Sequence, residues 1–407
     1  MLRLRATTPV RKQMIGWLPA LIWALLLVVV SARILGGEDR TVTAAYHQAA
    51  HNWIAGETMY EMDGGGFLYL PQAAVLYIPF SQLPGPWGGI MWRVCGVLLL
   101  AWGVRRISQI LAPGDPETHL GLAFFSALLC FSCLRNGQST LHMTAAMLLS
   151  AGNIYRERWG RATFWLLIGF AIKPLIIVMI LLAGAAVPRM RLRLAIGLTM
   201  VLLNPFLFQR PAYVAWQYQE FVAMLRTAHE LGVETWWAQL FGMFRAFGLD
   251  VPVLNQTAIR LAAAFGTLGV CLLAFQRLPA ARRMVWLYSL SAVYLLLFNP
   301  RTENNTYCLL GPVLGMFYVE ELTVRNRRRY AGGLLVLALL TLGSYELGKF
   351  LTPAGVRPIW LSPLACCVCA VYLGIRLKSE LSEAEGDASL VERECEDESN
   401  GLEQKAA

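Results

Sequence analysis

The sequence predicts an all-helical protein that crosses a membrane about 10 to 13 times. Hydrophobic residues make up 57% of the 407 residues and charged residues only 15%, whereas soluble globular chains carry roughly 25% charged residues. Apolar runs close to the ~20 residues that a helix needs to cross a bilayer recur from Gly16 to Leu377. Short connections with basic residues, proline or glycine separate most of them. This composition excludes soluble enzyme folds.

The first apolar run extends from Gly16 to Ile34 and follows four basic residues, so a cleaved signal peptide has to be weighed against a permanent anchor. Its length of about 19 residues exceeds that of a typical signal-peptide core. No small-x-small cleavage site is evident between Ser31 and Leu35. We therefore expect a retained first helix that follows a basic cytoplasmic segment, residues 1–15.

Nine further runs have the composition of membrane spans: roughly 86–104, 118–134, 138–155, 191–208, 258–276, 284–299, 306–321, 330–347 and 358–376. Residues 161–188 would place Arg189, Arg191 and Arg193 on the outer side if they crossed the membrane once, against the preference of basic residues for the cytoplasm. Two short helices that meet at Lys173-Pro174 return the chain to the cytoplasm, and the proline supplies the break. Residues 68–83 contain two prolines and are expected to be re-entrant or interfacial.

This arrangement places 23 of the 35 Lys and Arg residues on the cytoplasmic side and eleven outside, with Arg93 inside a span. It favours twelve membrane segments, the two short ones included, and a multi-pass cell-membrane protein with both termini in the cytoplasm. The membrane domain is expected at 16–377, with outer segments at 35–67 and 209–257. The tail, 378–407, holds ten acidic and three basic residues and is expected to be disordered in the cytoplasm.

Polar residues gather on the outer half of the predicted membrane domain: Glu38, Asp39, His47, His51, Asp63, Arg135 to Gln138, Lys173, Asn204, Arg210 and Asn299 to Glu303. Polar side chains beside or within spans are costly and indicate a functional site. They lie at one surface rather than along a path through the membrane, so an enzyme at the outer interface fits better than a transport pore. No third ligand accompanies the two histidines at useful spacing, so we expect no metal and no cofactor.

Several short motifs occur in the order found in a known membrane family: Tyr46, Ala49-Ala50, Gly56, Tyr60, Phe67-x-Tyr69-x-Pro71, Pro79, Gly137-Gln138, the basic turn Arg156 to Arg161, and Gly169-x-x-x-Lys173-Pro174. Asn299-Pro300 resembles the polar turn after a later helix of that family. Over about residues 37–320 the chain resembles glycosyltransferase family 87, the polyprenyl-phosphate-mannose-dependent mannosyltransferase type with the C-type membrane glycosyltransferase fold.

The resemblance implies transfer of a hexose, most often mannose, from a polyprenyl-phosphate sugar to an acceptor glycolipid or glycan on the outer face, with inversion. Such a reaction needs a carboxylate as general base. It also needs cations or hydrogen-bond donors that stabilise the departing lipid phosphate. Lys and Arg side chains supply such groups without a divalent ion. The implied partners are the donor lipid, the acceptor and membrane lipids. No nucleic-acid partner is expected, because the basic residues form no single stripe.

The expected base departs from the family pattern. The family usually places an aspartate a few residues before Tyr46, but positions 41–43 hold Thr, Val and Thr. Asp39, seven residues before Tyr46, and its neighbour Glu38 are therefore the candidates for the catalytic base. A solvated charge cluster that caps the following helix is the alternative.

The candidate substrate-binding residues are Tyr69, Gln138, Lys173, Arg210, Arg301 and Glu303. Lys173 is predicted to meet the lipid phosphate, or else to be a lysine that extends from a helix end to the interface. Gln138 either binds sugar hydroxyls through its amide or caps a turn. Arg301 and Glu303 either hold phosphate or acceptor, or pair with each other at the surface.

Two other function classes remain open at this stage. An arrangement of twelve segments with both termini inside is also typical of secondary transporters and lipid flippases. The two halves of this sequence, however, show no internal repeat. A non-catalytic membrane subunit of the same fold is the other alternative, because Asp39 is displaced from the position of the family's aspartate.

Overall fold

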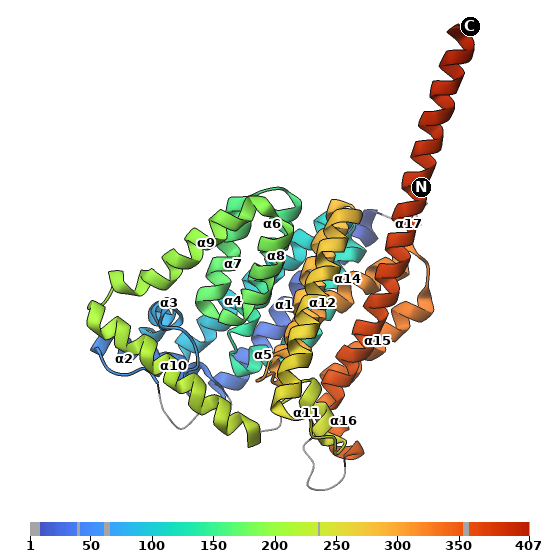
Figure 1. Ribbon diagram of the computed structural model, residues 1–407. Coiled ribbons are helices and arrows are strands. Elements are labelled where there is room, and N and C mark those ends of the chain that lie inside the picture. The colour runs from blue at the N-terminus through green and yellow to red at the C-terminus, as the bar shows by residue number, and fades with distance from the viewer. Residues whose placement is uncertain (1–8, 39–40, 61–65, 235–236, 353–357, 407) are drawn as a thin grey trace.

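The protein, seen here in a computed structural model, is all-helical (Figure 1). The structure describes residues 9–38, 41–60, 66–234, 237–352 and 358–406, and these contain no strand. The first half forms α1 (Pro9–Leu35), α2 (Thr43–Ala55), α3 (Pro71–Ser81), α4 (Trp87–Leu111), α5 (Pro116–Asn136), α6 (Thr140–Tyr155), α7 (Trp159–Ile172), the 3-10 turn η1 (Pro174–Ile176) and α8 (Ile177–Ala186). This confirms the predicted fold class.

The second half continues with the same kind of element. It forms α9 (Pro188–Leu203), η2 (Asn204–Leu207), α10 (Pro211–Glu234), α11 (Leu240–Ala246), α12 (Val253–Arg277), α13 (Ala280–Phe298), η3 (Asn304–Leu309), α14 (Leu310–Val319), the π-helical turn η4 (Glu320–Val324), α15 (Arg328–Leu342), α16 (Ser344–Leu351) and α17 (Leu361–Ala406).

Proline and glycine mark several helix boundaries. Proline begins α3, α5 and α9, where its missing N–H costs nothing because the first turn has no intrahelical acceptor for it. Gly56 and Gly137 follow α2 and α5 in the left-handed conformation that ends a helix, with φ of 77° and 69°. The local sequence thus defines these helix ends.

Eight spans within the described residues are long and apolar enough to cross a membrane, or nine if the pair α15 and α16, bent by 79°, is one span. This is fewer than the twelve predicted segments, because α6, α7 and α8 have only 16, 14 and 10 residues. A helix of roughly 20 residues is needed to cross the bilayer alone. α6 instead packs against α4, α7 and α13, so protein rather than lipid surrounds it.

The predicted break at Lys173-Pro174 is confirmed. α7 ends at Ile172, Lys173 is extended and η1 begins at Pro174. Arg189, just after α8, lies 3.5 Å from Glu157, just before α7. The two helices therefore form a hairpin whose tip carries Lys173.

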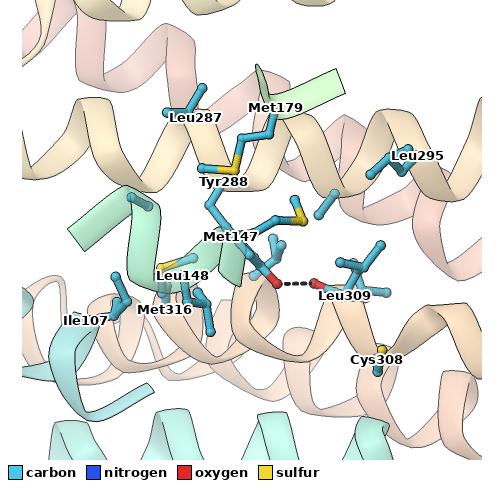
Figure 2. Close-up of a cluster of buried hydrophobic side chains, with 14 of the residues drawn as sticks. Ile107, Met147, Leu148, Met179, Leu287, Tyr288, Leu295, Cys308, Leu309 and Met316 are labelled. Carbon is cyan, nitrogen blue, oxygen red and sulfur yellow. Dashed lines mark hydrogen bonds between the residues drawn. The ribbon is translucent and has the colours of Figure 1, made fainter. Parts of the chain in front are cut away.

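The main core surrounds α6 (Figure 2). Met147 and Leu148 of α6 pack among Met179, Leu287 and other fully buried side chains. The Tyr288 hydroxyl donates to the Leu309 carbonyl at 3.0 Å, which satisfies the one polar atom of that side chain. A helix that is apolar on all sides requires such an enclosed position.

A second, smaller core lies under the predicted outer segments. Tyr46 and Trp53 of α2, Tyr77 of α3, Trp92 of α4 and Met224 of α10 are its larger members. α2, α3 and α10 lie together at one end of the helical bundle (Figure 1). This core packs α2, α3 and α10 against the neighbouring end of α4.

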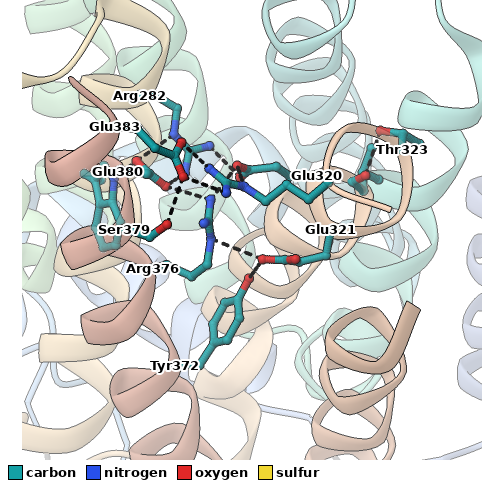
Figure 3. A network of polar contacts seen from close by, with 12 residues as sticks. Arg282, Glu320, Glu321, Thr323, Tyr372, Arg376, Ser379, Glu380 and Glu383 are labelled. Carbon is teal, nitrogen blue, oxygen red and sulfur yellow. Dashed lines mark hydrogen bonds and ion pairs between the residues drawn. The ribbon is translucent and has the colours of Figure 1, made fainter. Parts of the chain in front are cut away.

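A network of charged side chains attaches α17 to the ends of α13 and α14 (Figure 3). Arg376 contacts Glu320 at 2.6 Å, Glu321 at 3.2 Å and Glu380 at 3.1 Å. Arg282 pairs with both Glu320 and Glu380. Several partners compensate each buried charge, which is the condition under which buried ions are tolerated.

The secondary structure of the acidic tail differs from the prediction. Residues 378–407 are predicted to be disordered, but α17 continues through them to Ala406. The first part of the tail has partners in the membrane domain: Glu380 pairs with Arg282 and accepts from the Trp286 indole, and Glu383 pairs with Arg325 at 2.8 Å. The first acidic residues of the tail are thus matched by arginines distant in the sequence.

Candidate functional site

A cavity of about 420 Å³ opens where α5, α7 and α13 end beside α10. Its lining residues are Val42, Tyr46, Gly66, Leu68, Tyr69, Gln138, Lys173, Pro174, Leu175, Phe221, Leu225, Asn299, Pro300, Arg301, Glu303 and Thr306. They come from segments up to 264 positions apart, from Val42 to Thr306. The cavity combines two cations, one carboxylate and two amides, Gln138 and Asn299, with apolar walls.

Five of the eight predicted site residues line this cavity: Tyr69, Gln138, Lys173, Arg301 and Glu303. Arg210 is exposed before α10 and is not among the lining residues. Glu38 pairs with Arg135 and lies 3.8 Å from Arg33, away from the lining. Asp39 lies outside the described residues.

Lys173 is held at the tip of the α7–α8 hairpin. Its Nζ donates to Thr140 Oγ1 at 2.6 Å and lies 5.7 Å from the centre of the Tyr69 ring. No carboxylate of the described residues lies within 4.0 Å of this ammonium group. Among the described residues, the hairpin therefore presents a positive charge to the cavity with no carboxylate in direct contact, and an anionic ligand would supply that contact.

Gln138 and Glu303 face each other across the cavity wall. Gln138 is only 7% exposed, and its Nε2 donates to Glu303 Oε2 at 3.0 Å. Asn305 Nδ2 donates to the same oxygen at 3.3 Å. The amide and the carboxylate together offer donors and acceptors of the kind that bind sugar hydroxyls.

Arg301 extends from the loop after α13. Its guanidinium carbon lies 4.8 Å from the centre of the Trp237 ring, a cation–π contact. Burial lowers the pKa of Arg301, and the nearby charge of Glu303 opposes this change. The group stays protonated near neutral pH, because an arginine begins from a pKa above 12.

Tyr46 and the apolar wall were not among the site residues predicted from the sequence. The Tyr46 hydroxyl lies 3.1 Å from the Tyr69 hydroxyl and accepts from the Ser139 N–H at 3.3 Å. Burial raises the pKa of Tyr46 well above its usual value, so it remains a neutral donor. Phe221 and Leu225 are one helical turn apart on α10, and this i, i+4 apolar pair was the signal available in the sequence.

The turn that carries Gln138 depends on Arg93. This side chain is 3% exposed, and it donates to the carbonyls of Leu134, Arg135 and Gly89 and to Thr41 Oγ1, at 2.8–3.0 Å. It thereby satisfies carbonyls at the end of α5 that have no partner within the helix. The Trp92 indole donates to the Gly137 carbonyl at 3.1 Å, which fixes the same turn.

The sequence model of glycosyltransferase family 87 matches residues 67–300, more than half of the chain. The chain belongs to glycosyltransferase family 87. The matched region contains Tyr69, Gln138 and Lys173, and it ends at Pro300, directly before Arg301. No curated protein and no solved structure matches the chain.

Membership of family 87 makes the protein a glycosyltransferase of the membrane, with a sugar donor and an acceptor as substrates. This favours an enzyme over the transporter or lipid flippase that the sequence left open. Within the described residues, no three His, Cys, Asp or Glu side chains gather closely enough to hold a metal ion.

The close packing at Gly137 leads to a stability prediction. A Cβ there would lie 2.6 Å from Thr43 Cγ2 and 2.8 Å from Arg93 Nη2, at a φ of 69°. Gly137→Ala should therefore lower the free energy of unfolding by about 1 kcal/mol for the backbone and about 1–3 kcal/mol more for overpacking. Gly114→Ala is the matched control, because its φ is 72° and no atom lies within 4 Å of the added Cβ. Equal melting temperatures for the two purified variants would contradict the role assigned to this turn.

Proposed function

We propose that the protein transfers a hexose, with mannose as the first sugar to test, from a polyprenyl-phosphate sugar to a hydroxyl of an acceptor glycolipid or glycan, with inversion at C1. The cavity carries this proposal, because it joins Lys173, Arg301 and Glu303 to an apolar wall at the end of the helical bundle. A lipid-linked sugar phosphate has matching parts: an anionic phosphate, a hydroxyl-rich ring and an apolar chain.

The proposed donor site uses the two cations. Lys173 and Arg301 bind the phosphate, and the prenyl chain follows Leu175, Phe221 and Leu225. When the bond between C1 and the phosphate oxygen breaks, its electron pair stays on the phosphate, and the negative charge there increases. Fixed cations stabilise that charge more strongly in a largely apolar cavity than in water.

The proposed acceptor chemistry requires one proton to be removed. The acceptor oxygen attacks C1 from the face opposite the phosphate, and a carboxylate takes its proton. We assign this role to Asp39, following the family resemblance, and the binding of sugar hydroxyls to Gln138 and Glu303. Val42, three positions after Asp39, lines the cavity, which supports the assignment.

We also infer that the cavity faces the outside and that both termini are cytoplasmic. The basic turn from Arg156 to Arg161 and the start of α9 lie at the other end of the α7–α8 hairpin from Lys173. Basic residues prefer the cytoplasmic side of a membrane.

Thiol labelling of intact cells tests this orientation. In a background whose native cysteines do not react, Ala44→Cys on α2 should react with an impermeant reagent, whereas Arg189→Cys should react only after the membrane is opened. Both positions are exposed, so access depends on the side of the membrane alone. Reaction of Arg189→Cys in intact cells would rule out the proposed orientation.

Lys173→Ala should lower kcat/KM for transfer by about 10²–10³-fold, by analogy with the loss of one group that stabilises an oxyanion. Lys173→Arg should keep part of the activity, because the charge remains while its geometry changes. Arg226→Ala removes an exposed cation of α10 outside the lining and serves as the control. The measurement is transfer of radiolabelled sugar from a polyprenyl phosphate by purified protein; full activity of Lys173→Ala would show that the lysine is an interfacial anchor only.

Asp39→Asn should abolish transfer while binding of the donor lipid persists, because an amide does not accept the acceptor's proton at neutral pH. Glu303→Gln should mainly raise the KM for the sugar substrate, and Glu38→Gln should change little because Arg135 already holds that carboxylate. Transfer rates and donor binding are measured for all three variants. An active Asp39→Asn with an inactive Glu303→Gln would move the base to Glu303.

A further inference from the structure

A second cavity, of about 250 Å³, lies at the opposite end of α4, α6 and α7. Arg106 of α4, Arg156 and Arg158 of the turn after α6, and Arg161 of α7 line it. Arg161 near the start of α7 and Lys173 after its end are 12 positions apart, which at ~1.5 Å per residue is about 18 Å. This basic cavity is therefore separate from the site that contains Lys173.

The charges in the basic cavity lack acidic partners. Its lining contains no Asp or Glu, and none of its four arginine side chains forms an ion pair or a hydrogen bond with another described residue. Glu157, the one acid of the same turn, lies 3.5 Å from Arg189 instead. Like charges that share a partly apolar cavity repel one another, and a bound anion would remove this cost.

Aromatic side chains form the rest of the wall. Trp102 and Trp165 pack edge to face at 5.4 Å, and Phe164 packs against Trp165 at 5.3 Å. Trp102 is 42% exposed and Phe164 54% exposed. Exposed aromatic rings beside arginines at the end of membrane helices are typical of the headgroup level of a bilayer.

We propose that the basic cavity binds the phosphate group of an anionic membrane lipid, with the acyl chains along Trp102 and Phe164. Arginine suits this ligand, because its planar donors match phosphate oxygens in pairs. A soluble phosphate ester offers the same anion, but the exposed aromatic wall favours a ligand that also has an apolar part. The site does not depend on the transfer reaction proposed above.

Native mass spectrometry of the purified full-length protein tests the proposal. The probes are phosphatidylglycerol, phosphatidylcholine and soluble glycerol 3-phosphate. We expect the wild type to retain phosphatidylglycerol at least 10-fold more tightly than phosphatidylcholine, and we expect Arg106→Gln/Arg156→Gln to remove this preference. Arg105→Gln/Arg193→Gln removes the same charge from residues outside the lining and should keep it.

A second cavity variant controls for misfolding of the first. Arg158→Gln/Arg161→Gln changes exposed residues only, so it should fold normally and still weaken the preference for phosphatidylglycerol. Unchanged retention in both cavity variants, or an equal loss in the control, would overturn the proposal. Displacement of the lipid by glycerol 3-phosphate at a similar concentration would also overturn it and identify a site for soluble phosphate.

Discussion

The buried guanidinium group of Arg93 is the contact on which the cavity end of the molecule depends. It donates to the Leu134 and Arg135 carbonyls of α5, to the Gly89 carbonyl of its own helix and to Thr41 Oγ1 just before α2. A backbone carbonyl left without a donor in this apolar environment would cost several kcal/mol. One side chain thus joins α4, α5 and the segment before α2, and it fixes the turn that places Gln138 in the cavity.

The second constraint is the break between α7 and α8. Pro174 has no N–H to donate to the helical ladder, so the chain turns and Lys173 becomes the tip of a hairpin. The same break explains why α7 and α8 are shorter than a membrane span. A positive charge would be costly inside an apolar hairpin, but at its tip it reaches Thr140 and the cavity.

The basic side chains of the bundle differ in how their charges are compensated. Arg282, Arg325 and Arg376 are matched by glutamates of η4 and α17, which attach the last helix to the membrane domain. The arginines of the basic cavity and Lys173 have no such carboxylate partners within the described residues. This contrast separates charges with a structural role from charges that are available to ligands.

The sequence by itself determined the helical membrane fold, the break at Lys173-Pro174 and the family, because composition, apolar run length, proline chemistry and short motifs are local properties of a chain. It also selected five residues that line the cavity, since polar groups beside membrane spans are few. Only the tertiary structure decided that α6 is enclosed by protein and that α17 continues through the acidic tail. It also paired Glu38 with Arg135 and left Arg210 exposed, outside the cavity. These outcomes depend on contacts between residues that are far apart in the chain. Glu38 and Arg135, for example, are separated by 97 positions. A local sequence pattern does not identify such partners.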